Sequence, residues 1–381
     1  MGIKSITKKL FMAGCSVLGL ALPVDKKKVV FSSYFGRGYS DNPKAIAEVL
    51  LKRNSGAKLV WLVKDEKEAK SLPEGIIPCP YDSPKRIFEL SSARVWVDNC
   101  RKYERFKKKN QYYLQTWHGF PLKRIEKDAI DALGEYYAKG AIRDSKKTDL
   151  LISNSTFYTE VMERCFWYDG EIKKVGTPRN DVFVNGDPEA SRKVREAFSY
   201  EDDRHLLLFA PTFRADHSTD AYRIDASRLA KACEKRFGGK WTVLIRLHPN
   251  VAKQSAELFT YDNESVADAT MYPDMQELLC ASDILITDYS SSMFDFALSR
   301  KPCFRFALDL EDYIGDRNFY FDYEEIPFPA AYSNDEMIGI VENFSEEDYL
   351  CKVEEFYSRL ELLEDGKASE RCADWIEDKL S

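Results

Sequence analysis

Short apolar runs alternate with helical segments along most of this chain, and this alternation limits its fold more than any other feature. A strand followed by a helix and then another strand predicts a parallel sheet with helices on both faces. The runs that we interpret as strands are 29–32, 59–63, 93–98, 112–116, 149–154, 206–210, 241–247, 284–286 and 301–304. The sequence therefore predicts an α/β protein.

The length of the chain indicates more than one domain. Its 381 residues exceed what a single hydrophobic core usually serves. Residues 183–203 are polar and acidic with weak periodicity, which makes them the best place for the chain to cross between domains. We expect an N-terminal domain over 25–190 and a C-terminal domain over 191–345. Helices over 346–381 could pack back across both.

Charge and cysteine usage exclude several classes of protein. A net charge of -7 argues against general nucleic-acid binding. The nine cysteines are widely spaced without a CxxC pair, which predicts reduced thiols in a cytosolic protein. No His/Cys cluster has the spacing of a zinc site.

Residues 1–24 carry an amphipathic signal. Lys4, Lys8 and Lys9 precede a run of 13 apolar or small residues over 10–22, and a second basic cluster follows at 26–28. The run is short for a transmembrane helix, which needs about 20 residues. Basic residues beside a short apolar helix favour binding to an anionic membrane surface, although a helix packed on the body of the protein has the same pattern.

The stretch Asp283–Arg305 has the layout of a ligand site. An apolar strand ends at a polar turn, three serines follow at 290–292, and a helical pattern runs over 293–298. Serines at a helix N-terminus offer N–H groups and hydroxyls that suit phosphate. Asp295 lies one turn into the helix, where it could accept hydrogen bonds from a sugar or glycol. An ordinary helix cap uses the same residues, so the stretch alone favours neither interpretation.

Two histidines occur at strand ends. His118 follows the strand 112–116, and His248 follows the strand 241–247 on the same face as Arg246. A cation beside an imidazole suits pyrophosphate. A single histidine at such a place is more often structural, but two of them in a two-domain α/β chain indicate chemistry.

Six motifs in order resemble the CDP-glycerol glycerophosphotransferase family of teichoic-acid (or capsule) synthesis. They are QTWHGFPLK (115–123), GTPRND (176–181), APTFR (210–214), RLHP (246–249), ITDYSSSMFDFA (286–297) and RKP (300–302). One departure is Phe120, where relatives often carry a small hydroxylated residue. The length resembles that of a short, primase-like member rather than a long polymerase.

The resemblance implies a GT-B-like fold, with two Rossmann-like domains, parallel sheets and a cleft between the domains. It further implies transfer of glycerol phosphate from CDP-glycerol to a hydroxyl of an acceptor, with release of CMP. The N-terminal domain would hold the acceptor and the C-terminal domain the CDP-donor. The implied CDP-glycerol-binding residues are His118, Gly119, Phe120, Pro121, Leu122, Arg179, Pro211, Thr212, Arg246, Leu247, His248, Ser290, Ser291 and Asp295.

Within this set His118 is our candidate base, and Arg246 and His248 are candidates for stabilising the leaving phosphate. The roles of the two histidines could be exchanged. The sequence has no clear DxD motif, so we expect no metal and no other cofactor.

The partners expected from the resemblance are the donor, an undecaprenyl-diphosphate-linked saccharide acceptor and an anionic membrane surface, and we expect no nucleic acid. The protein would be peripheral, on the cytoplasmic face of the cell membrane. A CDP-ribitol-dependent ribitolphosphotransferase and a GT-B glycosyltransferase using a sugar nucleotide remain alternatives. A non-enzymatic scaffold descended from such enzymes is a further one, against which the joint presence of His118, Arg246 and His248 argues.

Overall fold

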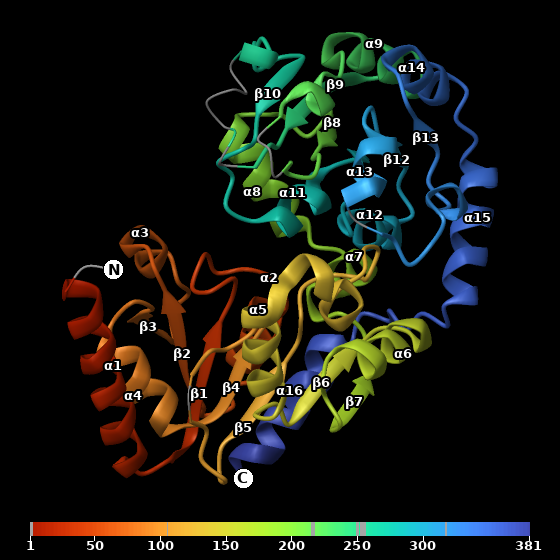
Figure 1. Cartoon of the computed structure of the whole chain (residues 1–381). Helices are drawn as coiled ribbons and strands as arrows, with labels where there is room; N and C mark the ends of the chain where they lie inside the picture. Colours follow the sequence, from red (N-terminus) through yellow and green to blue (C-terminus); the bar gives the residue numbers. More distant parts are fainter. Residues whose placement is uncertain (1–2, 105, 215–217, 249–250, 252–256, 317) are drawn as a thin grey trace. The chain divides into compact units, whose positions relative to one another are not determined.

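The structure is a computed structural model that describes the whole chain except residues 1–2, 105, 215–217, 249–250, 252–256 and 317. The chain forms two compact units (Figure 1). Unit 1 comprises Met1–His118, Ile125–Asp181 and Leu362–Ser381, and unit 2 comprises Gly119–Arg124 and Val182–Glu361. Each unit is therefore assembled from segments that are distant in the sequence.

Unit 1 is built on a sheet in which all paired strands run parallel, in the order β3-β2-β1-β4-β5-β6-β7. The strands are β1 (Asp25–Ser32), β2 (Lys58–Val63), β3 (Ile76–Pro80), β4 (Ala93–Asp98), β5 (Tyr112–Gln115), β6 (Leu150–Ser153) and β7 (Glu171–Lys174). The helices of this unit are α1 (Ile3–Ala21), α2 (Asp41–Lys52), α3 (Glu66–Lys70), α4 (Pro84–Ser92), α5 (Ile130–Ser145), α6 (Thr156–Cys165) and α16 (Ala368–Leu380), with short 3₁₀ turns η1 (Glu126–Ala129) and η2 (Pro178–Asn180).

Successive strand residues of unit 1 serve opposite faces of the sheet. Val29 and Phe31 of β1 lie in a buried cluster with side chains of α2 and α16, whereas Val30 lies in a second cluster with Leu90 of α4. This division follows from the two-residue period of a strand. Because both faces are covered, the strands are continuous apolar runs, which is why they are visible in the sequence.

Unit 2 repeats the architecture with a parallel sheet in the order β10-β9-β8-β11-β12-β13. Its strands are β8 (Arg204–Phe209), β9 (Lys240–Ile245), β10 (Val266–Asp268), β11 (Ile284–Thr287), β12 (Cys303–Phe306) and β13 (Ala330–Ala331). Its helices are α7 (Asp181–Asn185), α8 (Pro188–Phe198), α9 (Ala226–Phe237), α11 (Met275–Ala281), α12 (Ser292–Phe296), α13 (Leu310–Asp316), α14 (Asn334–Glu342) and α15 (Glu346–Arg359), with the 3₁₀ turns η3 (Asp220–Tyr222), η5 (Ala297–Ser299) and η6 (Tyr323–Glu325).

Two Rossmann-like units with parallel sheets confirm the predicted fold class. The chain passes from unit 1 into unit 2 after Asp181, ahead of α8, so the polar segment 183–203 lies within unit 2. The last two helices lie in different units, α15 in unit 2 and α16 in unit 1.

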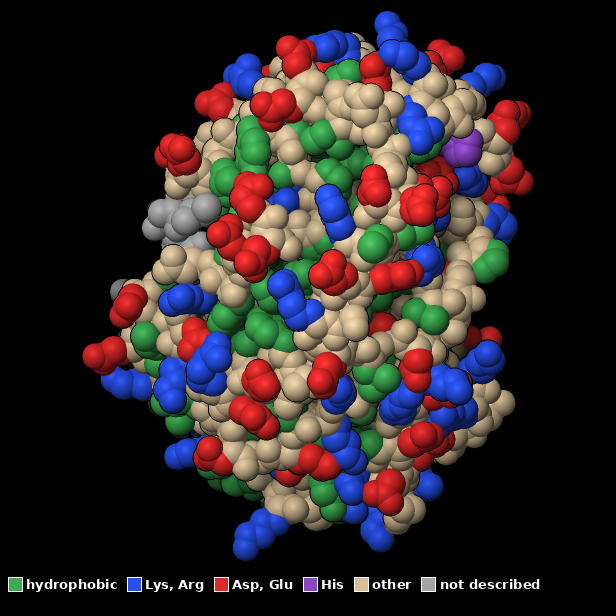
Figure 2. Space-filling view, turned by 90° about the vertical axis from the view of Figure 1, so that its right-hand side faces the viewer, with side chains coloured by type: hydrophobic (Ala, Val, Ile, Leu, Met, Phe, Trp, Pro, Cys, Tyr) green, Lys and Arg blue, Asp and Glu red, His purple; other side chains and the backbone are tan. Residues whose placement is uncertain are grey.

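The N-terminal segment forms a single helix, α1, that packs along α4. A β-carbon at Gly19 would lie 2.3 Å from the Ser91 hydroxyl oxygen, so the two helices approach closely there. Within the described chain, no helix has the length and apolar character needed to cross a bilayer. On the face of the molecule in Figure 2, acidic and basic side chains are interspersed rather than gathered by sign.

Candidate functional site

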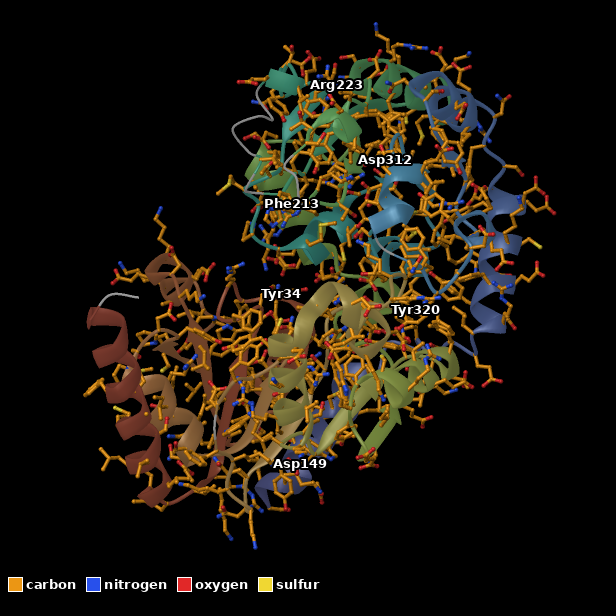
Figure 3. All side chains as sticks on the ribbon, in the orientation of Figure 1. Tyr34, Asp149, Phe213, Arg223, Asp312 and Tyr320 are labelled. Carbon is orange, nitrogen blue, oxygen red and sulfur yellow. The ribbon has the colours of Figure 1, made fainter. Side chains whose placement is uncertain are left out.

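The order of the strands marks the same place in both sheets. The order reverses between β1 and β4 in unit 1 and between β8 and β11 in unit 2. In open α/β sheets, ligands bind beyond the carboxyl ends of the strands at such a reversal. Tyr34, just after β1, lies at this end of the sheet of unit 1 in Figure 3, and Asp149 lies at the opposite end. Each predicted histidine also follows a carboxyl end, His118 after β5 and His248 after β9.

His118 is held in one tautomer by the segment that follows β4. Its Nδ1 lies 2.5 Å from the carbonyl oxygen of Asn99, which can only accept a hydrogen bond. Nδ1 therefore carries the proton, and Nε2 keeps a lone pair. Burial lowers the pKa of His118 below its usual value, and the Asn99 contact and the nearby Asp41 carboxylate offset this only in part. The imidazole is therefore mostly neutral near pH 7, as a general base must be.

Aromatic rings fix the plane of the imidazole. Trp117 stacks on it with ring centroids 4.6 Å apart, and Tyr34 meets it edge-on at 5.6 Å. The Cys100 sulfur lies 3.9 Å from Nδ1. These contacts leave the ring little rotational freedom.

Arg179 is buried in unit 1 and ion-paired. Its Nη1 lies 2.9 Å from Oδ2 of Asp41, and the two side chains are 5% and 6% exposed. The same carboxylate oxygen accepts a bond of 2.6 Å from the Tyr34 hydroxyl. Burial raises the pKa of Asp41, but Arg179 and Tyr34 outweigh that effect and the net pKa is lowered. The predicted donor contact Arg179 is thus already compensated by a carboxylate of its own unit.

Asn42 of α2 forms hydrogen bonds with the segments that contain Trp117 and Arg179. Its Nδ2 donates to the carbonyl oxygen of Trp117 at 3.0 Å, and its Oδ1 accepts from the backbone N–H of Arg179 at 3.0 Å. Asn42 lies in the first turn of α2, which begins at Asp41. Its role in holding Trp117 and Arg179 depends on contacts distant in sequence and was missed.

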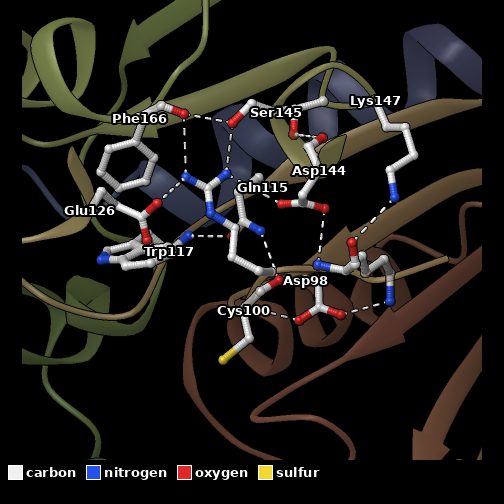
Figure 4. A network of polar contacts seen from close by, with 12 residues as sticks. Asp98, Cys100, Gln115, Trp117, Glu126, Asp144, Ser145, Lys147 and Phe166 are labelled. Atoms are coloured by element: carbon white, nitrogen blue, oxygen red, sulfur yellow. Dashed lines mark hydrogen bonds and ion pairs between the residues drawn. The ribbon is translucent and has the colours of Figure 1, made fainter. Parts of the chain in front are cut away.

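A buried network of polar contacts that includes Glu126 and Ser145 surrounds Trp117, the residue before His118 (Figure 4). The Arg101 guanidinium donates to Glu126 at 2.6 Å and to the Ser145 hydroxyl at 2.9 Å. It also lies over the rings of Trp117, at 5.6 Å, and Phe166, at 4.9 Å. Trp117 has a left-handed φ of 54°, so its backbone needs such support. Arg101 begins the basic stretch 101–109, and nothing in the sequence marks it as a buried cation.

Gly119–Leu122 belong to unit 2 and are packed into it. A β-carbon at Gly119 would lie 2.8 Å from the Ser291 hydroxyl oxygen, so a larger residue there would displace that hydroxyl. Phe120 is buried against Phe294, with ring centroids 4.6 Å apart, and Pro121 and Leu122 are also buried. Gly119 therefore lies next to Ser291 of the serine turn.

Thr212 lies where the strand order of unit 2 reverses. Its backbone N–H donates to Oδ1 of Asp288 at 2.8 Å, while its buried hydroxyl has no hydrogen-bond partner among the described residues. A buried hydroxyl without a partner is costly unless a ligand or water satisfies it. Pro211 beside it is buried, and Asp288, which is fully buried, was not among the predicted residues.

Arg246, Leu247 and His248 follow the last residue of β9. The backbone N–H of Arg246 still donates to Phe209 of β8, and Leu247 is buried between a half-buried Arg246 and an exposed His248. The predicted strand 241–247 thus ends two residues early, at Ile245, and the shared face of 246 and 248 that we inferred from a strand period stays a prediction. Arg246 donates to the carbonyl oxygens of Ala269 and Tyr272. Pro249 of this motif lies outside the described residues.

Burial lowers the pKa of Arg246, and this outweighs the opposing effect of Asp274. The surrounding protein thus leaves the cation under-compensated. A bound anion would correct that imbalance.

The serine turn precedes a short helix. α12 has 5 residues, so its dipole is smaller than a long helix would provide, and the N-cap Ser291 makes no side-chain cap bond. The Ser290 hydroxyl accepts from the Ser292 hydroxyl at 2.9 Å. Asp295 is buried. A helix this short adds little positive potential at the serine turn.

Among the residues described by the structure, no group of three or more His, Cys, Asp or Glu side chains is arranged to hold a metal ion.

Comparison with known proteins identifies the family. A family model described as CDP-Glycerol:Poly(glycerophosphate) glycerophosphotransferase matches residues 15–378. Teichoic acid poly(glycerol phosphate) polymerases of Staphylococcus epidermidis and Bacillus subtilis are 33% and 32% identical over 93% and 97% of this chain, which spans about half their length, 51% and 50%. A teichoic acid glycerol-phosphate transferase of Staphylococcus aureus is 31% identical, with 92% of this chain and 93% of that protein aligned.

A solved structure of the wall teichoic acid polymerase TagF, soaked with CDPG, aligns with a TM-score of 0.82 and 30% identity, covering 100% of this chain and 98% of that chain. A teichoic acid poly(glycerol phosphate) polymerase of Bacillus spizizenii aligns over 98% of both proteins at 28% identity, so chain length does not separate primases from polymerases here. The chain belongs to the CDP-glycerol:poly(glycerophosphate) glycerophosphotransferase family.

Proposed function

We propose that the protein transfers glycerol phosphate from CDP-glycerol to a hydroxyl of a membrane lipid-linked saccharide, in teichoic-acid synthesis, with release of CMP. The observation that carries the proposal is the fixed tautomer of His118 in a member of this family. Its Nδ1 is committed to Asn99, so Nε2 has a lone pair for the acceptor hydroxyl proton.

The chemical step is a displacement at phosphorus. The acceptor oxygen attacks the phosphorus that bears glycerol, and its proton passes to Nε2 of His118. A new phosphodiester bond forms as the bond from that phosphorus to the bridging oxygen breaks. CMP leaves with the bridging oxygen and the electron pair.

The donor is proposed to lie on unit 2, at the reversal of its strand order. The unsatisfied hydroxyl of Thr212 and the under-compensated cation of Arg246 both support a phosphate ligand. Ser290, Ser291 and His248 would complete the phosphate contacts, and Asp295 would accept from glycerol or ribose hydroxyls. The packed Gly119–Leu122 run would hold the serine turn in shape.

The acceptor is proposed to lie on unit 1, beside His118. There Arg179 would act through Asp41, by keeping Tyr34 and the neighbouring loops in place.

The protein is further proposed to bind the cytoplasmic face of the membrane through α1. Cys15 and Gly19 of this helix are buried against the body, whereas Phe11, Val17 and Leu18 are exposed. Exposed apolar side chains on this helix and the exposed lysines at 26 and 27, soon after it in the chain, suit an anionic surface. Glutamate at Phe11 and Leu18 should abolish binding to anionic vesicles, and glutamate at the exposed Val184 of unit 2 should not. Equal binding by both variants would refute the proposal.

Ribitol remains a second candidate polyol, because a teichoic acid poly(ribitol-phosphate) polymerase of Bacillus spizizenii is 30% identical over 98% of this chain. The test is nucleotide release from CDP-glycerol, CDP-ribitol and a UDP-sugar, each with a lipid-linked disaccharide. CMP from CDP-glycerol alone is the expected result. CMP from CDP-ribitol alone would change the donor, and UDP release alone would overturn the reaction class.

A further inference from the structure

We propose that Phe35 and Tyr103 form an aromatic platform that binds the saccharide portion of the acceptor next to His118. The two rings are nearly parallel, with an interplanar angle of 8° and centroids 6.3 Å apart. Tyr103 is 54% exposed and Phe35 is half-buried. The identification of the ligand as the acceptor rests on the proposed function, whereas the site itself rests on the geometry of unit 1.

The platform occupies the reversal of strand order in unit 1. Phe35 lies three residues after the end of β1, and Tyr103 lies five residues after the end of β4. Neighbouring strands that send their connections in opposite directions leave a crevice at their carboxyl ends, where ligands of α/β proteins bind. The equivalent place in unit 2 holds Thr212 and Asp288. One exposed and one half-buried ring therefore lie where this fold places a ligand.

The loop that carries Phe35 and the ring of His118 both contact Asn99. Tyr34, which precedes Phe35, meets the His118 ring at 5.6 Å. The backbone N–H of Tyr34 donates to Oδ1 of Asn99 at 2.9 Å, and the carbonyl of the same asparagine contacts His118 Nδ1. A ligand that contacts Phe35 would therefore lie near the imidazole of His118, because the neighbouring Tyr34 contacts that ring.

The backbone holds Phe35 in an unfavourable conformation. Tyr34, Phe35 and Gly36 have φ angles of 43°, 61° and 83°, and aromatic residues rarely occupy this left-handed region. A β-carbon at Gly36 would lie 2.6 Å from the Tyr81 ring, so the loop is packed tightly from behind. Strain of this kind concentrates at ligand sites, because the surrounding structure must enforce it.

Tyr103 is supported from the other side by α5. A β-carbon at Gly140 would lie 2.8 Å from Cε1 of Tyr103, so the helix approaches the edge of the ring without blocking its exposed part. Two supported rings with open surface suit a pyranose, which presents a face of C–H groups and a rim of hydroxyls. Aromatic side chains bind such amphipathic ligands by contact area at low entropic cost.

The test compares Tyr103→Ala and Phe35→Leu with Tyr136→Ala, which alters a tyrosine of unit 1 that is 88% exposed. We expect both platform variants to raise KM for a lipid-linked disaccharide by about 10-fold, the effect of losing one stacking contact. KM for CDP-glycerol should stay unchanged, and Tyr136→Ala should behave as the wild type. Thermal melting verifies that each variant is folded.

Unchanged acceptor KM in both platform variants would overturn the proposal. A rise in KM for CDP-glycerol instead would assign the rings to the cytosine base, which also overturns it.

A binding measurement separates this proposal from the reaction. Titration of a soluble N-acetylhexosamine disaccharide, followed by NMR, should show weaker binding to Tyr103→Ala than to the wild type. If the wild type released no CMP from CDP-glycerol but this difference were present, the reaction would fail and the platform would stand. Equal binding by the two proteins, or none by the wild type, would overturn the platform whatever the reaction.

Discussion

Asp41→Asn removes the charge of a buried side chain in unit 1 and nearly keeps its shape. Asparagine has nearly the size of aspartate and tolerates the left-handed φ of 65° at this position. It removes the carboxylate charge that pairs with the Arg179 guanidinium, which is 5% exposed. Breaking a buried ion pair by removing one partner costs about 3–5 kcal/mol. Because the amide oxygen can still accept hydrogen bonds, we expect the free energy of unfolding to fall by about 3 kcal/mol.

The assay is urea unfolding at pH 7 of Asp41→Asn, Arg179→Met and the double variant. The pKa of Asp41 is lowered in the folded protein, so its contribution is present above the unfolded value of about 3.9 and is lost only as pH falls through the lower folded value. At pH 7 the whole effect is therefore measured. The double variant should lose clearly less than the sum of the single losses, by about 2 kcal/mol.

Arg192→Ala, at a surface ion pair, is the matched control and should leave unfolding unchanged. Strict additivity of the two buried substitutions would refute the claim that Asp41 and Arg179 act as a unit.

Further predictions concern His118 in unit 1 and Gly119 and Arg246 in unit 2. The lowered pKa of His118 places the acid limb of the rate profile below pH 6.5, with activity lost as pH falls and the imidazole gains a proton; an acid limb above pH 6.5 would contradict the burial argument. Gly119→Ala should weaken CDP-glycerol binding in a folded protein, because its β-carbon would displace the Ser291 hydroxyl, whereas Gly339→Ala, where a β-carbon meets nothing within 4 Å, should not; an equal effect of both would contradict this reasoning. Arg246→Met should raise KM for CDP-glycerol by about 30-fold, the loss of one charge-assisted contact of about 2 kcal/mol, with Arg223→Met, at an exposed site, as control; an equal effect of both would refute a specific phosphate contact.

The interior of each sheet could be predicted from sequence, but its edges could not. Each run that we interpreted as a strand corresponds to an interior strand, because a strand covered on both faces is a continuous apolar run. The edge strands β3, β7, β10 and β13 were missed. β3 contains Pro78 and Pro80, and β7 exposes Lys173 and Lys174. Prolines and charges protect sheet edges from pairing with other chains, and they also hide such strands from pattern analysis.

Some residues of the candidate site could likewise be predicted from the sequence, and others could not. Residues inside contiguous motifs, such as His118 and Arg246, could be selected from the sequence because a strand end and a resemblance marked them. Asn99 and Asp41 could not, since their roles depend on contacts with residues 19 and 138 positions away. Asp288 lay within a motif already singled out, and its place directly after β11 was a signal that could have been used.

Following the phosphorus atoms of CDP-glycerol shows whether phosphorus is transferred to the acceptor and whether that transfer needs His118. ³¹P NMR of the reaction with a lipid-linked disaccharide should show one new phosphodiester on the acceptor for each CMP released. His118→Ala should form neither product while melting close to the wild-type temperature. Release of CDP, with glycerol joined to the acceptor and no phosphorus transferred, would show attack at carbon and rule out transfer at phosphorus.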